Sequence, residues 1–143
     1  MTQPMTLTDR AALTRHRARA RSLPGHDEAL FLHRLALADL QERLEEVNRT
    51  FTAPAVVTGF PWIFGDLAPM EVVADDDLIA LEPNAHDLVV HAMSLHWAND
   101  PIGQLVQCRR ALRPDGLCLV VLPGGRSLQE LRASLAEAET TVT

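Results

Sequence analysis

The chain has 143 residues, which is enough for one domain with a modest core but not for two full domains. Hydrophobic residues make up 47% of it and charged residues 22%, as in ordinary globular proteins, so a largely disordered chain is excluded. The formal net charge is -6 and no apolar run is long enough to cross a bilayer, so we expect neither a nucleic-acid partner nor a membrane span.

The cysteine content and the first residues bear on the cellular compartment. Cys108 and Cys118 are too few and too far apart for a disulfide framework or a zinc site, and we expect no bound metal. Residues 1–9 contain no apolar stretch of the signal-peptide type. A cytoplasmic location with reduced thiols is therefore predicted.

Residues 1–26 are expected to form a basic N-terminal helical arm. The stretch 15–21 places four arginines and His16 within seven positions. Such a cluster can bind phosphate, an acidic partner or an anionic surface, although a solvated helix or a frayed arm is the commoner outcome. Leu23-Pro24-Gly25 interrupts the chain after it, which predicts a second region over residues 27–143.

The segment after this break predicts a helix of about twenty residues. Asp27 is suitable as its N-cap, and apolar residues recur at helical spacing along one face. This apolar stripe comprises Leu30, Leu37, Leu40, Leu44 and Val47. We expect the helix to lie on an apolar sheet.

Four short apolar segments predict buried strands, namely residues 53–59, 71–75, 87–93 and 116–122. The last two are apolar on both faces, as in parallel strands that helices cover from both sides. Strands alternating with helices at this spacing favour an α/β fold. We predict a partial Rossmann-like parallel sheet of about four strands, with helices on both faces.

Capping signals predict two further helices. Asp100 is the expected N-cap of one of them and Pro101 its first residue, and the segment 113–116 ends that helix and turns into the last strand. Ser127 and Glu130 have the spacing of a capping box, which predicts a final helix.

Candidate site residues follow the predicted strands, because ligands of open parallel sheets bind beyond the carboxyl ends of the strands. The acidic segment 75–77 could bind a ribose hydroxyl, an amine or a hard cation, or could form only a solvated turn. His91 and His96 could position a substrate or act as a general base, but their spacing is not that of a helical metal pair. The alternative for the adjacent Trp97 is packing against the sheet edge.

The loop after the first predicted strand lacks the Gly-x-Gly-x-x-Gly pattern of dinucleotide sites. It runs from Gly59 to Gly65, and Phe60 and Trp62 stand where a phosphate or carboxylate would need bare backbone. We expect these two rings to obstruct a cofactor there.

Several segments together resemble class I S-adenosylmethionine-dependent methyltransferases. Residues 87–100 are similar to the fourth strand and following loop of that family, and residues 112–116 to its turn into the fifth strand. Residues 124–132 resemble a Gly-Gly-x-(Ser/Thr)-Leu-x-Glu-Leu-Arg segment, and residues 74–77 the acidic loop after the third strand. The subgroup with the greatest similarity contains a mitochondrial complex I assembly factor described as an arginine hydroxylase, with biotin-pathway malonyl-carrier-protein methyltransferases as more distant relatives.

The resemblance implies S-adenosylmethionine as cofactor and a set of site residues. The expected cofactor-binding residues are Thr58, Gly59, Asp75, Asp76, His91 and Leu95. Asp75 and Asp76 would face the adenine or its surroundings, and residues 91–95 would line the methionine end. His91 and His96 are the expected catalytic residues, which would orient or deprotonate the acceptor.

The chain departs from the family's pattern in three respects. The glycine loop is degraded, as described above. Only about a dozen residues separate Gly59 from the next strand, too few for the helix, second strand and helix of the family, so no ribose-binding acid is assigned. The chain also ends at Thr143, before the family's sixth and seventh strands, which predicts either a fragment or a reduced relative.

Two functions from different classes follow as alternatives. The first is a methyltransferase-like protein that uses S-adenosylmethionine on a protein substrate, such as an arginine or a respiratory-complex subunit. The second is a non-catalytic assembly module that kept the fold and lost the cofactor site. Missing strands would expose sheet edges and favour a homo-oligomer. An arginine hydroxylase would need a metal or another oxidant, and no metal-ligand spacing supports one.

Overall fold

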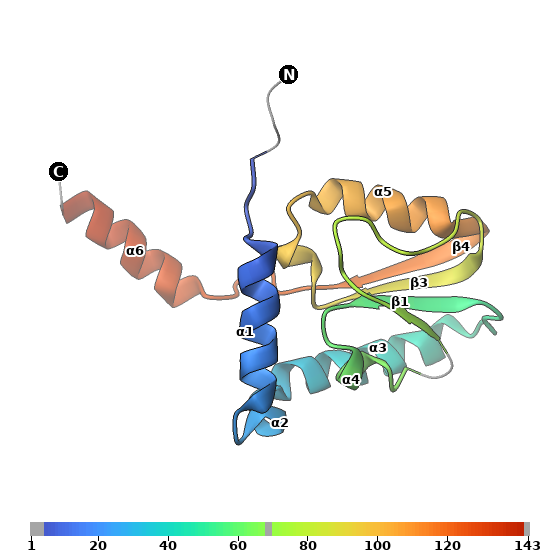
Figure 1. The fold of residues 1–143 in the computed structure, drawn as a ribbon, viewed down its shortest axis with the longest axis horizontal. Helices are drawn as coiled ribbons and strands as arrows, with labels where there is room; N and C mark the ends of the chain where they lie inside the picture. Colours follow the sequence, from blue (N-terminus) through green and yellow to red (C-terminus); the bar gives the residue numbers. More distant parts are fainter. Residues whose placement is uncertain (1–4, 68–69, 142–143) are drawn as a thin grey trace.

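A computed structural model describes residues 5–67 and 70–141. Its centre is a parallel sheet with the strand order β2-β1-β3-β4 (Figure 1). The strands are β1 Pro54–Thr58, β2 Glu71–Val73, β3 His86–Ala92 and β4 Leu112–Val121. The predicted Rossmann-like α/β fold and its four strands are therefore confirmed.

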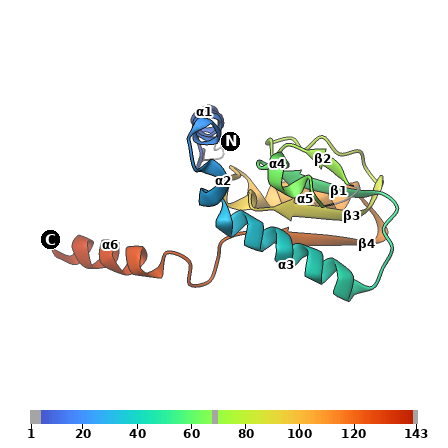
Figure 2. The ribbon, with the colours of Figure 1, turned by 90° about the horizontal axis from the view of Figure 1, so that it is seen from below.

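Helices cover both faces of this sheet, and two helices lie at its margin. The helices are α1 Arg10–Ser22, α2 His26–Ala29, α3 Phe31–Val47, α4 Pro61–Phe64, the 3-10 helix η1 Leu95–Trp97, α5 Pro101–Ala111 and α6 Gln129–Thr141. Figures 1 and 2 show α3 below the sheet and α5 on the opposite face, while α1 crosses the carboxyl ends of the strands and α6 extends away from the sheet.

The period-2 alternation of the strands gives each helix layer its own core. Val56 and Leu88 pack in one cluster with Leu40 of α3, whereas Val57 and Val89 pack in a second cluster with α5. The apolar stripe predicted for the long helix is confirmed, since Leu40 is fully buried and its neighbours on that stripe pack against the first cluster.

The predicted caps have different outcomes. Asp100 caps α5, because its Oδ1 accepts a hydrogen bond of 2.8 Å from the Gly103 amide, and Pro101 begins the helix as expected. Asp27 is wrong as a cap, because it lies inside the short helix α2, and Leu30 precedes α3. The capping box at Ser127 is also wrong, because that hydroxyl donates to the Gly124 carbonyl.

The position of β2 follows from the short connection that precedes it. Among the described residues between β1 and β2, the only helix is the single turn of α4, so the chain returns at once beside β1. Val56 of β1 pairs in parallel with Val72 of β2. The segment after Gly59 is too short for the helix, second strand and helix of the family, but β2 nevertheless lies next to β1 in the sheet.

The basic arm forms a helix that contacts the sheet domain at both of its ends. Asp9 caps α1, since its Oδ1 accepts a 2.9 Å bond from the Ala12 amide. Just before it, the Leu7 and Thr8 amides donate to Oδ1 of Asn99, at 2.9 and 2.8 Å. A frayed arm, one of the expected alternatives, is thus not what residues 7–22 form.

Candidate functional site

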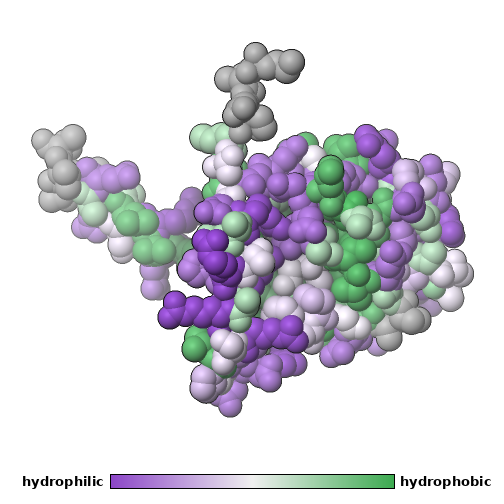
Figure 3. Space-filling model, in the orientation of Figure 1, coloured by the Kyte–Doolittle hydropathy of each residue, from purple (hydrophilic) through white to green (hydrophobic). Residues whose placement is uncertain are grey.

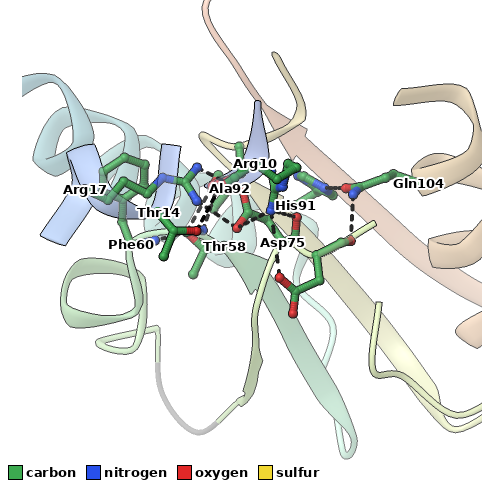
Figure 4. Close-up of polar contacts among 12 residues, drawn as sticks. Arg10, Thr14, Arg17, Thr58, Phe60, Asp75, His91, Ala92 and Gln104 are labelled. Atoms are coloured by element: carbon green, nitrogen blue, oxygen red, sulfur yellow. Dashed lines mark hydrogen bonds and ion pairs between the residues drawn. The ribbon is translucent and has the colours of Figure 1, made fainter. Parts of the chain in front are cut away.

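The carboxyl ends of β1, β2 and β3 meet under α1 (Figure 4). Thr58 ends β1 and donates its hydroxyl proton to the Ala92 carbonyl at the end of β3, over 3.1 Å. The Gly59 amide donates to Oγ of Ser94 over 2.8 Å. These bonds fix the two loops against each other and leave the backbone of Gly59 facing α1.

Asp75, directly beyond β2, is the most strongly bound acidic group at this edge. Its carboxylate accepts two parallel bonds from Arg17, Nη1 to Oδ1 and Nη2 to Oδ2, each 2.9 Å long. Nη2 of Arg10 lies 3.5 Å from Oδ1 and also binds the Asp75 carbonyl at 2.6 Å. The Asp75 side chain is only 5% exposed. Burial alone would raise the pKa of Asp75, but the bonds and charges of the two arginines outweigh it and hold the pKa below its ordinary value.

Arg17 also lies against Gly59. A Cβ atom at position 59 would collide with the guanidinium of Arg17, so the absence of a side chain there is what lets Arg17 approach. Arg17 further stacks over the Phe60 ring, with its Cζ 5.2 Å from the centroid, and Arg21 stacks over Trp62 at 4.5 Å. Phe60 and Trp62, the two rings expected to obstruct a cofactor, form a platform for arginines of α1.

His91 is sealed beneath this surface. It is fully buried, and its Nε2 lies 2.7 Å from Oε1 of Gln104, whose amide nitrogen donates to the Asp76 carbonyl. Because an amide oxygen only accepts, Nε2 carries the proton, and Nδ1 is a bare acceptor without a partner among the described residues. Burial lowers the pKa of His91 despite the Gln104 bond and the Asp75 charge, so the ring is neutral at pH 7.

His96 and Leu95 lie in η1, the short helix that follows β3. Burial and the charge of Arg17 lower the pKa of His96, although the Asp75 charge acts in the opposite direction. The ring of His96 tilts against Trp97 at a centroid distance of 5.2 Å. Trp97 stays 40% exposed, so it is not sealed into the sheet edge, whereas Leu95 is buried.

The structure brings most of the predicted site residues to one cavity of about 490 Å³. Thr58, Gly59, Asp75 and Asp76 line it, together with residues of α1. His91 lies behind this lining, and Leu95 and His96 are not part of it. The Asp76 side chain is 74% exposed and lies 3.9 Å from Arg10, and its carbonyl accepts a hydrogen bond from Gln104.

Sequence reasoning missed the α1 face of this cavity. That face consists of Arg10, Thr14, Arg17, Ala18 and Arg21. Arg10, Thr14, Arg17 and Arg21 are spaced by four, three and four residues, which places them on one face of the helix. This helical periodicity was the signal in the sequence that could have found them. Sequence reasoning also missed His33, whose ring lies 4.2 Å from that of Phe60 and whose pKa burial lowers, aided by the charges of His96 and Arg17.

A second cavity, of about 570 Å³, lies on the other side of α1. Its walls are mostly apolar and aromatic, and Phe60 and Trp97 contribute to them. Arg17 and Trp62 line both cavities, so α1 separates a mostly apolar space from one that is lined by several charged residues. Among the described residues, no three or more His, Cys, Asp or Glu side chains are placed to hold a metal ion.

Comparison with known proteins identifies the family. Residues 30–120 match the family model described as a methyltransferase domain. The chain belongs to the class I S-adenosylmethionine-dependent methyltransferases. The match includes the sheet, from before β1 into β4, and both helix layers. It also includes every predicted site residue.

Individual relatives align with about half of the chain. It is 41% identical over 75 residues to the mitochondrial arginine-hydroxylase NDUFAF5 of Mus musculus, covering 52% of this chain and 22% of that protein. It is 33% identical over 69 residues to a putative methyltransferase of Rickettsia prowazekii (48% and 30%). It is 33% identical over 81 residues to malonyl-[acyl-carrier protein] O-methyltransferase of Methylovorus sp. (57% and 27%).

The aligned segments thus span less than a third of these relatives' own lengths. No solved structure matches the chain. In the described part of the methyltransferase chain, none of the helices has the length and apolar character needed to cross a membrane.

The family implies S-adenosylmethionine as cofactor, and the chemical groups at the site are of the types that bind such a ligand. A carboxylate follows the strand beside β1, and bare backbone at Gly59 allows close approach of a ligand. The guanidinium of Arg17, however, already lies against both groups.

Proposed function

We propose that this chain is the cofactor-binding part of a methyltransferase that acts on a protein substrate. The observation that carries the proposal is the meeting of Gly59 and Asp75 at one cavity in a chain of this family. In open α/β sheets a ligand lies across the carboxyl ends of the first strand and its neighbour. Both groups lie at those ends.

Asp75 is proposed to hold the ribose hydroxyls of the cofactor. The sequence resemblance assigns it to the loop after the family's third strand, near the adenine. In this sheet its strand pairs directly with β1. Rossmann-type folds place the acid that binds the ribose at the end of that neighbouring strand. Topology therefore supports the ribose role, which sequence spacing left without a residue.

The two histidines are proposed to have different roles. S-adenosylmethionine supplies a methyl group already activated on a sulfonium, so the protein mainly positions the reactants. His91 is bonded to Gln104 and fully buried behind the cavity lining, which suits a positioning residue. His96 lies in η1, and its lowered pKa keeps it neutral and able to accept a proton from an acceptor group.

The name of one relative supports an acceptor that is carried on a protein. It is named for methylation of a malonyl group on acyl-carrier protein. A respiratory-complex subunit and a cytoplasmic location, implied earlier by the resemblance and by composition, stay predictions.

Calorimetric titration tests cofactor binding directly. We expect S-adenosylmethionine and S-adenosylhomocysteine to bind with a 1:1 stoichiometry, because both carry the ribose diol that Asp75 would hold. ATP is the control ligand, because it carries the same adenosine but has a triphosphate in place of the methionine that residues 91–95 would contact, and it should bind much more weakly. If millimolar S-adenosylmethionine or S-adenosylhomocysteine gives no heat and no thermal shift, the proposal is wrong.

The second candidate, a non-catalytic interaction module, is favoured by the apolar surface at the C-terminal side. Leu128, Leu131 and Leu135 of the α6 region are 71%, 53% and 57% exposed, and Figure 3 shows hydrophobic surface along this helix. The outer edge of β4 has no strand partner among the described residues. Such a surface is proposed to form a homo-oligomer. Light scattering that shows a clean monomer at tens of micromolar protein would count against it.

A further inference from the structure

We infer that α1 competes internally with the nucleoside, because Arg17 occupies the two groups, Gly59 and Asp75, that the cofactor would contact. This inference rests on the proposed function. It adds that cofactor binding requires Arg17 to leave the site by release of α1.

The contacts of Arg17 are those of a bound ligand rather than of a solvated arginine. Both carboxylate oxygens of Asp75 accept from it at 2.9 Å, and the Phe60 ring stacks on the guanidinium. The guanidinium fills the space that glycine leaves at position 59. Its side chain is 15% exposed. A carboxylate, an aromatic face and a bare backbone thus form a receptor for a planar cation, which Arg17 fills from within the chain.

A ribose diol that donates to both oxygens of this carboxylate would take the bidentate position that the Arg17 guanidinium occupies. Two parallel bonds from Arg17 use both Asp75 oxygens, and Arg10 approaches the same carboxylate at 3.5 Å. If Arg17 leaves, Arg10 still offsets the Asp75 charge, and hydroxyl donors of the ligand can replace the lost hydrogen bonds. The exchange therefore does not leave a buried carboxylate without a cation nearby.

The rest of α1 is held by contacts that permit release. No residue of this helix, all of which the structure describes, is buried. Figure 3 shows a hydrophilic surface over α1 on the face that it displays. The helix is tethered by the Asn99 bonds before it and by a turn after it, where Gly25 adopts a φ of 77°. Arg10, Arg17 and Arg21 supply its polar and stacking contacts to the β1 and β2 loops.

Competition has a measurable consequence for affinity. The apparent Kd rises in inverse proportion to the fraction of molecules whose site is open. Removing the internal competitor should therefore tighten binding of S-adenosylhomocysteine, whereas removing a residue that contacts the ligand would weaken it.

The test compares Arg17→Ala with Arg19→Ala by calorimetry with S-adenosylhomocysteine. Arg19 is exposed on the same helix, so its variant controls for the change in charge and in helix propensity. We expect R17A to bind at least about fivefold more tightly than the wild type, and R19A to bind as the wild type does. Arg17→Lys should lie between them, because lysine keeps the charge but loses the bidentate fork.

Limited trypsin digestion supplies a second measurement, since α1 contains several arginines. Cleavage within residues 15–21 should speed up in R17A without ligand, and in the wild type when S-adenosylhomocysteine is added. Weaker binding by R17A, or protection of α1 by the ligand in the wild type, would overturn the inference while leaving the proposed function intact. If neither protein binds the ligand, the proposed function fails and the inference fails with it.

Discussion

At the residue scale, the site depends on side chains that fix one another across long sequence distances. His91, Gln104 and the Asp76 carbonyl form one chain of hydrogen bonds from β3 through α5 to the acidic loop. Each member has its donor and acceptor roles set by the next, so the imidazole tautomer is determined by an amide that lies 13 positions away.

Replacing Gln104 with leucine tests this chain. The buried Nε2–H of His91 would lose its acceptor, which costs about 1–3 kcal/mol of unfolding free energy. Urea unfolding measures the loss, and the imidazole ¹⁵N spectrum should lose the fixed Nε2–H tautomer. Gln41→Leu, at an exposed position of α3, is the control and should change stability by less than about 0.5 kcal/mol. Equal effects of the two variants would contradict this role.

Acid should destabilise the protein through its buried histidines. Burial lowers the pKa of His33, His91 and His96, so the unfolded chain takes up protons first as pH falls below about 6.5. The free energy of unfolding should therefore be greatest above that value and should fall between pH 7 and pH 5. His33→Gln should make the fall shallower in urea titrations. A stability that stays constant over this range would refute the assignment.

The ion pair of Asp75 acts at lower pH and with the same sign. Since its folded pKa is below the ordinary value, its stabilising effect is present above about pH 4 and is lost only as pH falls through the folded pKa. The histidine effect and the carboxylate effect are thus separated along the pH axis.

Part of this residue-level arrangement was predictable. Gly59 and Asp75 were predicted as site residues because they follow apolar strands, and strand ends converge in a parallel sheet. Arg17 was not predicted as the partner of Asp75, because 58 positions separate the two residues and the sequence alone does not indicate where α1 lies. The arginine cluster was noticed, but a run of charges is usually a solvated face.

At the scale of elements, α3 shows how one apolar stripe positions a helix. Leu40 is fully buried against the sheet, whereas Leu35 on the other side of the same helix is 63% exposed. Helical spacing alone predicted the buried face. Its start was predicted incorrectly at Asp27, because a short helix and Leu30 intervene, and no periodicity reports such a break.

Alanine at position 40 should destabilise the protein strongly. Removing this buried leucine leaves a cavity between α3 and the sheet, which costs about 2–5 kcal/mol in unfolding free energy. Leu35→Ala is the matched control, and it should change stability by less than about 1 kcal/mol because its side chain is already in solvent. Denaturant unfolding of both variants is the measurement, and similar losses would show that α3 does not pack as described.

At the scale of the whole molecule, the strand order determines which functional groups lie next to one another at the edge of the sheet. The sequence predicted four strands and a parallel α/β sheet, but it assigned no acid to the ribose because the segment after Gly59 is short. That same shortness leads β2 directly back to the side of β1, which brings Asp75 to the carboxyl edge of the sheet beside Gly59. Sheet order is a long-range property, and local propensities do not encode it.

The central claim is that Asp75, at the carboxyl edge of the sheet, is the residue that binds the ribose of the nucleoside. The most direct test is calorimetric titration of S-adenosylhomocysteine into R17A, where the internal competitor is absent, and into the double variant R17A/D75N. Asp66→Asn on the R17A background is the control, because Asp66 is an exposed carboxylate outside the cavity. We predict 1:1 binding to R17A and to the control, and a loss of about tenfold or more in the double variant, equivalent to about 1.4 kcal/mol. Equal affinity of R17A and R17A/D75N, or no binding to either, would contradict the claim.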